Sequence, residues 1–188
     1  GVRLSWECGS RPRRAMAIDR ALPPSNAPLP PVTASVALTL LDQDTPVWLS
    51  PSWGRGADWL RFHRGCPIAA QPEKAAFILA ASLTEMPPLI LLNQGSDRYP
   101  DSSATVILGS TLPLDGQSPL RAQGPGIDGF IVFQGHGLNR EFLAQWRNNR
   151  ESYPLGVDVF LTGELFLAGL PRSVSLDDEN FQGGRSCM

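Results

Sequence analysis

The chain lacks the short motifs that usually mark an active site. Its 188 residues contain no G-x-S-x-G turn, no GxxxxGK[ST] loop, no H-E-x-x-H helix and no C-x-x-C pair. Only two histidines are present, His63 and His136, so we do not expect a metal site with several histidine ligands within one chain. These absences exclude several common enzyme classes and leave the function open.

Lysine is almost absent. Lys74 is the only lysine among the 16 basic residues, so the other 15 (16 − 1) are arginines. Chemistry that needs a lysine Schiff base therefore has a single candidate. Arginine suits bidentate contacts with carboxylates or phosphates better than lysine does.

The chain also lacks cysteine pairs, long apolar runs and an excess of basic charge. Three cysteines, Cys8, Cys66 and Cys187, are an odd number and argue against a disulfide framework. No run reaches the roughly 18 apolar residues of a membrane span, and the first residues show no apolar segment of signal-peptide length. The net charge of −2 does not provide the positive electrostatic potential that attracts nucleic acid. We expect a cytoplasmic protein with reduced thiols that binds neither nucleic acid nor membrane.

Glycine and proline are abundant, with 18 of each, which favours many short elements joined by turns. We expect an Arg- and Pro-rich arm at 1–31, one domain at 32–176 and a flexible tail at 177–188. Closely spaced prolines exclude a continuous helix from 22 to 31. Within the arm, the two alternatives are a short helix at 13–21 and a partly disordered terminus.

Three segments have the apolar spacing of helices. They are 33–42, with Thr33 as the N-cap, 57–64, closed by Gly65, and 139–153, with Asn139 as the N-cap. Strands are expected at 47–49, 75–81, 103–110, 120–123 and 130–133. Residues 89–92 fit either a helix or a strand. The irregular alternation predicts an α/β fold with a mixed sheet flanked by helices.

The densest strand signal is a hairpin within residues 153–174. Apolar runs at 157–162 and 165–170 are separated by Gly163-Glu164, a pair typical of a type II′ turn. Asp158 lies inside the first run, and Arg172 follows the second after a proline. We expect these two charges to form a buried pair with a structural role, either within the sheet or at a subunit contact.

Two further places carry candidate binding residues. In the helix at 57–64, Arg61 and His63 suit a proton donor or a phosphate contact, but a histidine satisfied by a backbone carbonyl is the simpler interpretation. At Gly124 and Gly126, backbone N–H groups could meet an anion. A tight turn is favoured there, because the intervening proline has no N–H.

Asp42 and Asp44 also allow two interpretations. Two neighbouring carboxylates can perform acid–base chemistry. Short acidic side chains beside a threonine and a proline more often cap turns, and we favour that role.

Seven stretches follow one another in chain order in a pattern that resembles a known family. They are LTLLDQDTPVWLS (38–50), LRFH (60–63), a P-[IL]-x-x-x-P-E-x-A-x-F form (67–77), SATVIL (103–108), LRAQGPGI (120–127), YPLGVD (153–158) and LPRSV (170–174). Together they resemble the PhnH family, a subunit of the bacterial carbon–phosphorus lyase system. The resemblance spans 32–175, and the N-terminus does not show the family's usual opening helix.

The resemblance implies a three-layer α/β/α sandwich, similar to the large domain of PLP-dependent transferases but without bound PLP. It also implies a homodimer that joins PhnG, PhnI and PhnJ in a core complex. That system displaces adenine from ATP by a phosphonate, giving a ribose 1-phosphonate 5-triphosphate.

Three hypotheses follow. The favoured one is a structural or co-catalytic complex subunit, with no catalytic residue and no metal assigned to this chain. The alternative is a stand-alone nucleotide- or phosphonate-binding module, or a small enzyme, built on Arg61, His63 and Arg172. In the third, the hairpin with Leu165 and Phe166 forms an interface.

Overall fold

The computed structural model describes residues 16–17, 27–109, 120–133, 137–164 and 166–178. Its main sheet has six strands in the order β1-β8-β7-β4-β3-β2. These strands are β1 (Met16–Ala17), β2 (Val47–Leu49), β3 (Phe77–Ala80), β4 (Thr105–Gly109), β7 (Asp158–Thr162) and β8 (Phe166–Leu170). Strands β2, β3, β4 and β7 pair in parallel, whereas β8 runs antiparallel to both β7 and β1. The predicted mixed sheet is therefore confirmed.

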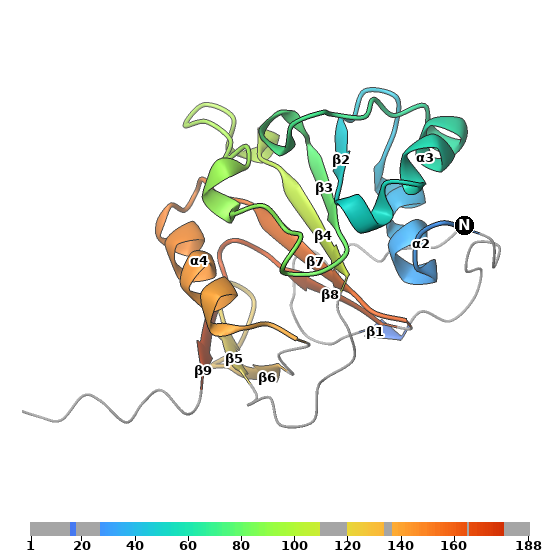
Figure 1. Cartoon of the computed structure of the whole chain (residues 1–188). Coiled ribbons are helices and arrows are strands. Elements are labelled where there is room, and N and C mark those ends of the chain that lie inside the picture. The colour runs from blue at the N-terminus through green and yellow to red at the C-terminus, as the bar shows by residue number, and fades with distance from the viewer. Residues whose placement is uncertain (1–15, 18–26, 110–119, 134–136, 165, 179–188) are drawn as a thin grey trace, which may run out of the picture.

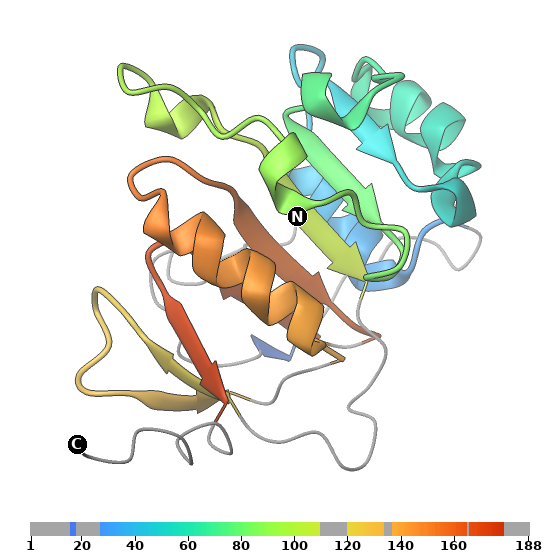
Figure 2. The same cartoon turned by 60° about the vertical axis from the view of Figure 1, so that its left-hand side comes forward.

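Helices cover both faces of this sheet. Helices α2 (Pro31–Leu40) and α3 (Gly56–Arg64) lie on one face, and α4 (Arg140–Glu151) crosses the other (Figure 1). A small antiparallel sheet lies beside α4, with its strands in the order β6 (Ile131–Phe133), β5 (Leu120–Gln123) and β9 (Ser175–Asp178), as Figure 2 shows. Within the described ranges, no helix has both the length and the apolar character needed to cross a lipid bilayer.

Among the described residues, four short 3-10 helices lie in the connections. They are η1 (Pro51–Trp53), η2 (Pro72–Lys74), η3 (Leu89–Leu91) and η4 (Pro100–Ser102). The ambiguous segment at 89–92 thus forms neither a strand nor an α-helix, and its first residue, Leu89, is buried against α4.

The strands divide the apolar side chains between two cores, because successive residues of a strand point to opposite faces. On β3, Ile78 belongs to the core under α4, and Leu79 belongs to the core under α2 and α3. On β4, Val106 and Ile107 divide in the same way. A central sheet packed on both faces explains why its strands read as continuous apolar runs.

The predicted N-cap of α4 and the predicted glycine after α3 are confirmed, although α4 ends at Glu151, two residues earlier than predicted. The side chain of Asn139 accepts a hydrogen bond from the backbone N–H of Phe142 at 2.8 Å, which satisfies a donor at the start of α4. At the end of α3, Gly65 has φ = 67°, a left-handed conformation in which a residue without Cβ is not strained.

The start of α2 differs from the prediction. The helix begins at Pro31, two residues before Thr33, because a proline at the first position loses no intrahelical hydrogen bond. Thr33 is fully buried, and its hydroxyl lies 2.8 Å from the hydroxyl of Thr162 on β7. The Thr162 hydroxyl in turn donates to the carbonyl of Leu108 at 3.2 Å. Thr33 therefore joins α2 to the sheet and is not an N-cap.

Both ends of the predicted domain also change. Met16 and Ala17 pair with β8 as a strand, so a helix across 13–21 is wrong at these two residues. Leu29 is buried in the core under α2, although the sequence placed it in the arm. Asp177 and Asp178, assigned to the tail, pair with β5 in β9. Residues 1–15 and 18–26 of the arm and the tail from 179 onward lie outside the described residues.

The β7–β8 hairpin is confirmed, but Gly163 is not a residue of its turn. Thr162 pairs with Leu167, and the N–H of Gly163 donates to the carbonyl of Phe166 at 3.0 Å. Gly163 is thus a paired position with no left-handed φ, so Gly163-Glu164 is not a type II′ turn. The ring of Phe166 occupies the space that a Cβ on residue 163 would need, and this contact explains the glycine.

The hydroxyl bridge between α2 and β7 can be tested by replacing Thr33 with valine, which keeps the shape and removes the hydroxyl. We expect Thr33→Val to lower the free energy of unfolding by about 1 kcal/mol, because the buried Thr162 hydroxyl loses its bond to Thr33 and keeps only the one to Leu108. The matched control is Thr39→Val on the same helix. Its hydroxyl bonds only to Ser35 within α2, and its side chain is exposed. Urea unfolding that shows equal losses for the two variants would contradict the assignment.

Candidate functional site

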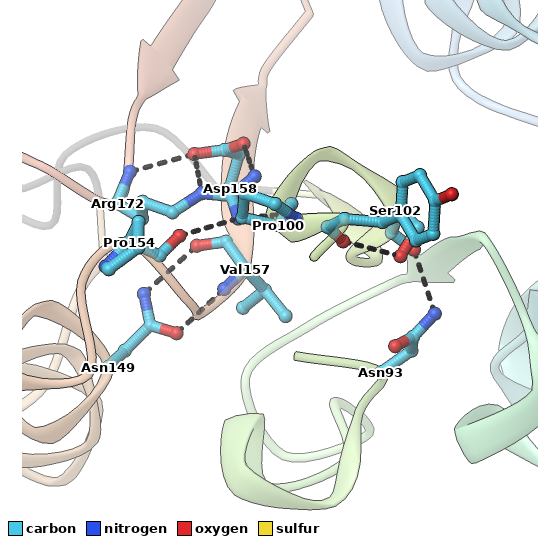
Figure 3. A network of polar contacts seen from close by, with 9 residues as sticks. Asn93, Pro100, Ser102, Asn149, Pro154, Val157, Asp158 and Arg172 are labelled. Atoms are coloured by element: carbon cyan, nitrogen blue, oxygen red, sulfur yellow. Dashed lines mark hydrogen bonds and ion pairs between the residues drawn. The ribbon is translucent and has the colours of Figure 1, made fainter. Parts of the chain in front are cut away.

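The predicted pair of Asp158 and Arg172 forms a bidentate ion pair. Asp158 is the first residue of β7, and Arg172 lies just beyond the end of β8. Its Nη2 donates to Oδ2 of Asp158 at 2.6 Å, and its Nε and backbone N–H reach Oδ1 at 3.3 and 2.8 Å (Figure 3). The side chains are only 14% (Arg172) and 35% (Asp158) exposed, so water screens the pair less than it would a surface pair.

The remaining side-chain nitrogen of Arg172, Nη1, joins two loops that are far apart in the sequence. Its Nη1 donates to the carbonyl of Pro100 at 2.9 Å and to that of Pro154 at 3.4 Å. Each proline follows a tyrosine, and these are the two tyrosines of the chain, Tyr99 and Tyr153. We call Asp158, Arg172, Pro100 and Pro154 the arginine clasp.

A buried asparagine lies directly beside the clasp. The side chain of Asn149, near the end of α4, accepts from the N–H of Val157 at 2.8 Å and donates to its carbonyl at 2.9 Å (Figure 3). The backbone turns between them at Gly156, whose φ is +113°. A Cβ there would lie 2.8 Å from Oδ1 of Asn149, so only glycine fits this close approach.

The clasp and its neighbours connect four segments of the chain. The N–H of Gly156 donates to Gln94 at 3.0 Å, and the indole N–H of Trp146 donates to Val174 at 2.9 Å. The loop at 93–102, the end of α4, the start of β7 and the connection from β8 to β9 therefore meet at one place. Three nitrogens of the Arg172 side chain already have partners there, so the residue positions backbone and offers little to a ligand.

Gly124 and Gly126 form a turn, as the sequence favoured. The N–H of Ile127 donates to the carbonyl of Gly124 at 3.1 Å, Pro125 is the second turn residue, and Gly126 has φ = 80°. This is the pattern of a type II turn. At Gly124 a Cβ would lie 3.0 Å from a methyl group of Val174, so this glycine allows two chain segments to touch.

A pocket of about 640 Å³ opens beside this turn. It lies between the turn, the end of α4 and the connection from β8 to β9. Its lining is mostly polar and comprises Gln123, Gly124, Pro125, Ile127, Gly129, Arg150, Glu151, Tyr153, Ser173 and Ser175. The charges of Arg150 and Glu151 oppose each other, so the pocket has no clear preference for an anion.

Arg61 and His63 lie on α3, on the other face of the sheet from α4. Both are exposed, and Arg61 pairs with Asp58 at 3.0 Å. The ring of His63 contacts those of Trp59 and Phe62, with centroids 4.7 and 5.0 Å away. Arg172 is held at the arginine clasp, so the structure does not join these three predicted residues into one binding site.

Two other sequence candidates have structural roles. The hydroxyl of Thr45 and the N–H of Asp44 both donate to Asp42 and lower the pKa of its carboxyl. Asp42 therefore caps a turn, as favoured. Burial raises the pKa of the Cys66 thiol, which keeps it in the less reactive protonated form. Cys8, Cys187 and His136 lie outside the described residues, and among the described ones no cluster of three or more metal-ligand side chains is found.

The roles of Asn149 and of the carbonyls of Pro100 and Pro154 were not predicted from the sequence. A polar residue near the end of an amphipathic helix ordinarily faces solvent, so Asn149 carried no distinguishing signal. The two Tyr-Pro pairs were visible, but nothing local indicates that positions 54 residues apart (154 − 100) share one guanidinium.

These features define a small α/β protein with a mixed sheet, helices on both faces and an arginine clasp at one end of the strands. A family model described as "Bacterial phosphonate metabolism protein (PhnH)" matches residues 3–177. The chain belongs to the PhnH family. The match begins well before residue 32, so the family extends further toward the N-terminus than the seven stretches indicated.

Two relatives agree with this assignment. Alpha-D-ribose 1-methylphosphonate 5-triphosphate synthase subunit PhnH of Rhizobium meliloti (strain 1021) is 35% identical over 179 residues, covering 94% of this chain and 88% of the relative. A putative C-P lyase subunit protein, HtxG, of Stutzerimonas stutzeri is 33% identical over 112 residues, covering 58% of this chain and 54% of the relative.

Removing the guanidinium tests the arginine clasp. We expect Arg172→Ala to lower the free energy of unfolding by about 2 kcal/mol, because Asp158 and the carbonyl of Pro100 lose a charged donor. Arg61→Ala is the matched control. It removes an ion pair whose two side chains are 55% and 93% exposed, and should change stability by no more than about 0.5 kcal/mol. Chemical unfolding curves that coincide for the two variants would refute the role of the clasp.

Proposed function

We propose that the chain is a subunit of a carbon–phosphorus lyase core complex and is required for organic phosphonate catabolism. The observation that carries the proposal is its 35% identity, across 94% of the chain, to a protein named as a subunit of a ribose 1-methylphosphonate 5-triphosphate synthase. Coverage of 88% of that relative means that the similarity is not restricted to a shared fragment.

The proposed complex joins a phosphonate to the ribose of ATP. An oxygen of the phosphonate bonds to C1′ of the ribose, the bond from C1′ to adenine breaks, and adenine leaves. The product is a ribose 1-phosphonate 5-triphosphate. Within this reaction we assign the chain a structural or co-catalytic role. The assignment is supported by the arginine clasp, in which the predicted pair of Asp158 and Arg172 orders the backbone.

The finer parts of the proposal concern cofactor, partners and location. We propose a homodimer that assembles with PhnG-, PhnI- and PhnJ-type subunits in the cytoplasm. The helix-covered mixed sheet supports a similarity to the large domain of PLP-dependent transferases. We nevertheless expect no PLP, and Lys74, the one lysine, is exposed on the 3-10 turn η2.

A stand-alone nucleotide- or phosphonate-binding module is the less favoured alternative. It would need Arg61, His63 and Arg172 to act on one ligand. Arg172 is committed to the clasp, and Arg61 and His63 lie on α3. Calorimetric titration of the chain with ATP and with methylphosphonate distinguishes the two, because heat that disappears in Arg61→Ala would favour the alternative.

Reconstitution tests the proposed function directly. The chain is mixed with PhnG-, PhnI- and PhnJ-type subunits, ATP and methylphosphonate, and released adenine is measured by chromatography. We expect adenine release with the full set of subunits, at least about tenfold less when this chain is omitted, and none from this chain alone. Two results would contradict the proposal: full activity without the chain, or turnover by the chain alone.

The oligomeric state can be tested separately by light scattering. We expect the purified chain to have twice the monomer mass and, if the hairpin forms the contact, Phe166→Glu and Leu165→Glu to reduce it to a monomer. Circular dichroism checks that both variants remain folded. A monomeric wild-type chain would contradict the homodimer, and dimeric variants would show that the contact lies elsewhere.

A further inference from the structure

The most exposed large apolar side chain in the described part of the chain is Phe62. Its side chain is 85% exposed, and it lies between Arg61 and His63 on α3. The neighbouring Leu60 faces the core and holds the helix in place. Core packing thus explains Leu60 and leaves Phe62 unexplained. We call Arg55, Arg61, Phe62 and His63 the α3 basic face.

Aromatic contacts connect Phe62 to the core through His63 and Trp59. The ring of His63 meets that of Phe62 edge-on, at 89° and 5.0 Å between centroids. His63 also contacts Trp59 at 4.7 Å, and Trp59 packs against the core under α2 and α3. A row of three rings therefore leads from the core to the surface. Aromatic and arginine side chains are enriched at the cores of protein interfaces.

The charged side chains of α3 itself are mainly positive. Arg55 and Arg61 are exposed, and Asp58 is the single carboxylate on the helix. The pair between Arg61 and Asp58 is open to solvent, so Arg61 can exchange Asp58 for another carboxylate at little cost. The chain as a whole has a net charge of −2, so the sign of this face is opposite to that of the molecule.

We propose that the α3 basic face is a docking surface for an acidic patch, with an apolar socket for Phe62, on another subunit of the proposed complex. This inference depends on the proposed function. A second copy of this chain fits less well, because two such faces brought together would repel through Arg55 and Arg61. The hairpin considered for the homodimer is a separate element, so the two contacts can be tested independently.

The proposal can be tested by measuring the affinity of the folded chain for the assembled complex of the other subunits. We expect Phe62→Ala and Arg61→Glu each to weaken binding by at least about tenfold, as truncation of a central interface residue does. The matched controls change the same chemistry on the other face of the sheet: Ile90→Ala, 72% exposed on η3, and Arg140→Glu, exposed at the start of α4. Both controls should bind within about twofold of wild type.

Ionic strength and alternative ligands complete the design. The loss caused by Arg61→Glu should shrink as salt is raised, whereas that caused by Phe62→Ala should persist. Wild-type affinity retained in both variants would overturn the docking surface. So would dimerisation of this chain through Phe62, or Phe62-dependent binding to RNA or to anionic vesicles. If the wild-type chain itself does not bind the other subunits, the proposed function fails first.

Discussion

The ion pair between Asp158 and Arg172 fixes the segments that meet where β7 begins and β8 ends. Asp158 begins a central strand, so its position is set by the sheet. Arg172, held by Asp158, donates to the carbonyls of Pro100 and Pro154. These bonds fix the loop at Pro100 and the segment that follows α4 relative to the sheet. Asn149 does the same through the backbone of Val157. Because each contact satisfies backbone carbonyls or N–H groups, the irregular segments keep a defined shape without a regular hydrogen-bond ladder.

The elements that could be predicted from sequence are those whose signals are local. Asn139 caps α4 and Gly65 ends α3 because each effect involves only a few neighbouring residues. The pair of Asp158 and Arg172 was also predictable, since a charge inside an apolar run needs a partner. The choice between a turn and an anion loop at Gly124 was correct for a simple reason, namely that Pro125 has no N–H to offer.

The errors occurred where distant contacts decide the local structure. Threonine is a common N-cap residue, but Thr33 lies inside α2, where its hydroxyl meets that of Thr162 on the sheet. Glycine is a common turn residue, but the N–H of Gly163 bonds to the carbonyl of Phe166. The ring of Phe166 fills the space that a Cβ on residue 163 would need. Met16 and Ala17 become a strand only because β8 offers an edge. In each case the deciding partner is close in space and invisible in the local pattern.

The division of the interior into two cores has a consequence for how the protein tolerates change. The face bearing α3 and the face bearing the clasp and α4 share the sheet, but each fills its own apolar layer. Substitutions on one face therefore leave the packing of the other nearly undisturbed, and their effects on stability add. Exposed side chains on α3 can therefore be exchanged without disturbing the packing between α4 and the sheet. The sheet thus separates the packing around the arginine clasp from the packing beneath the α3 basic face.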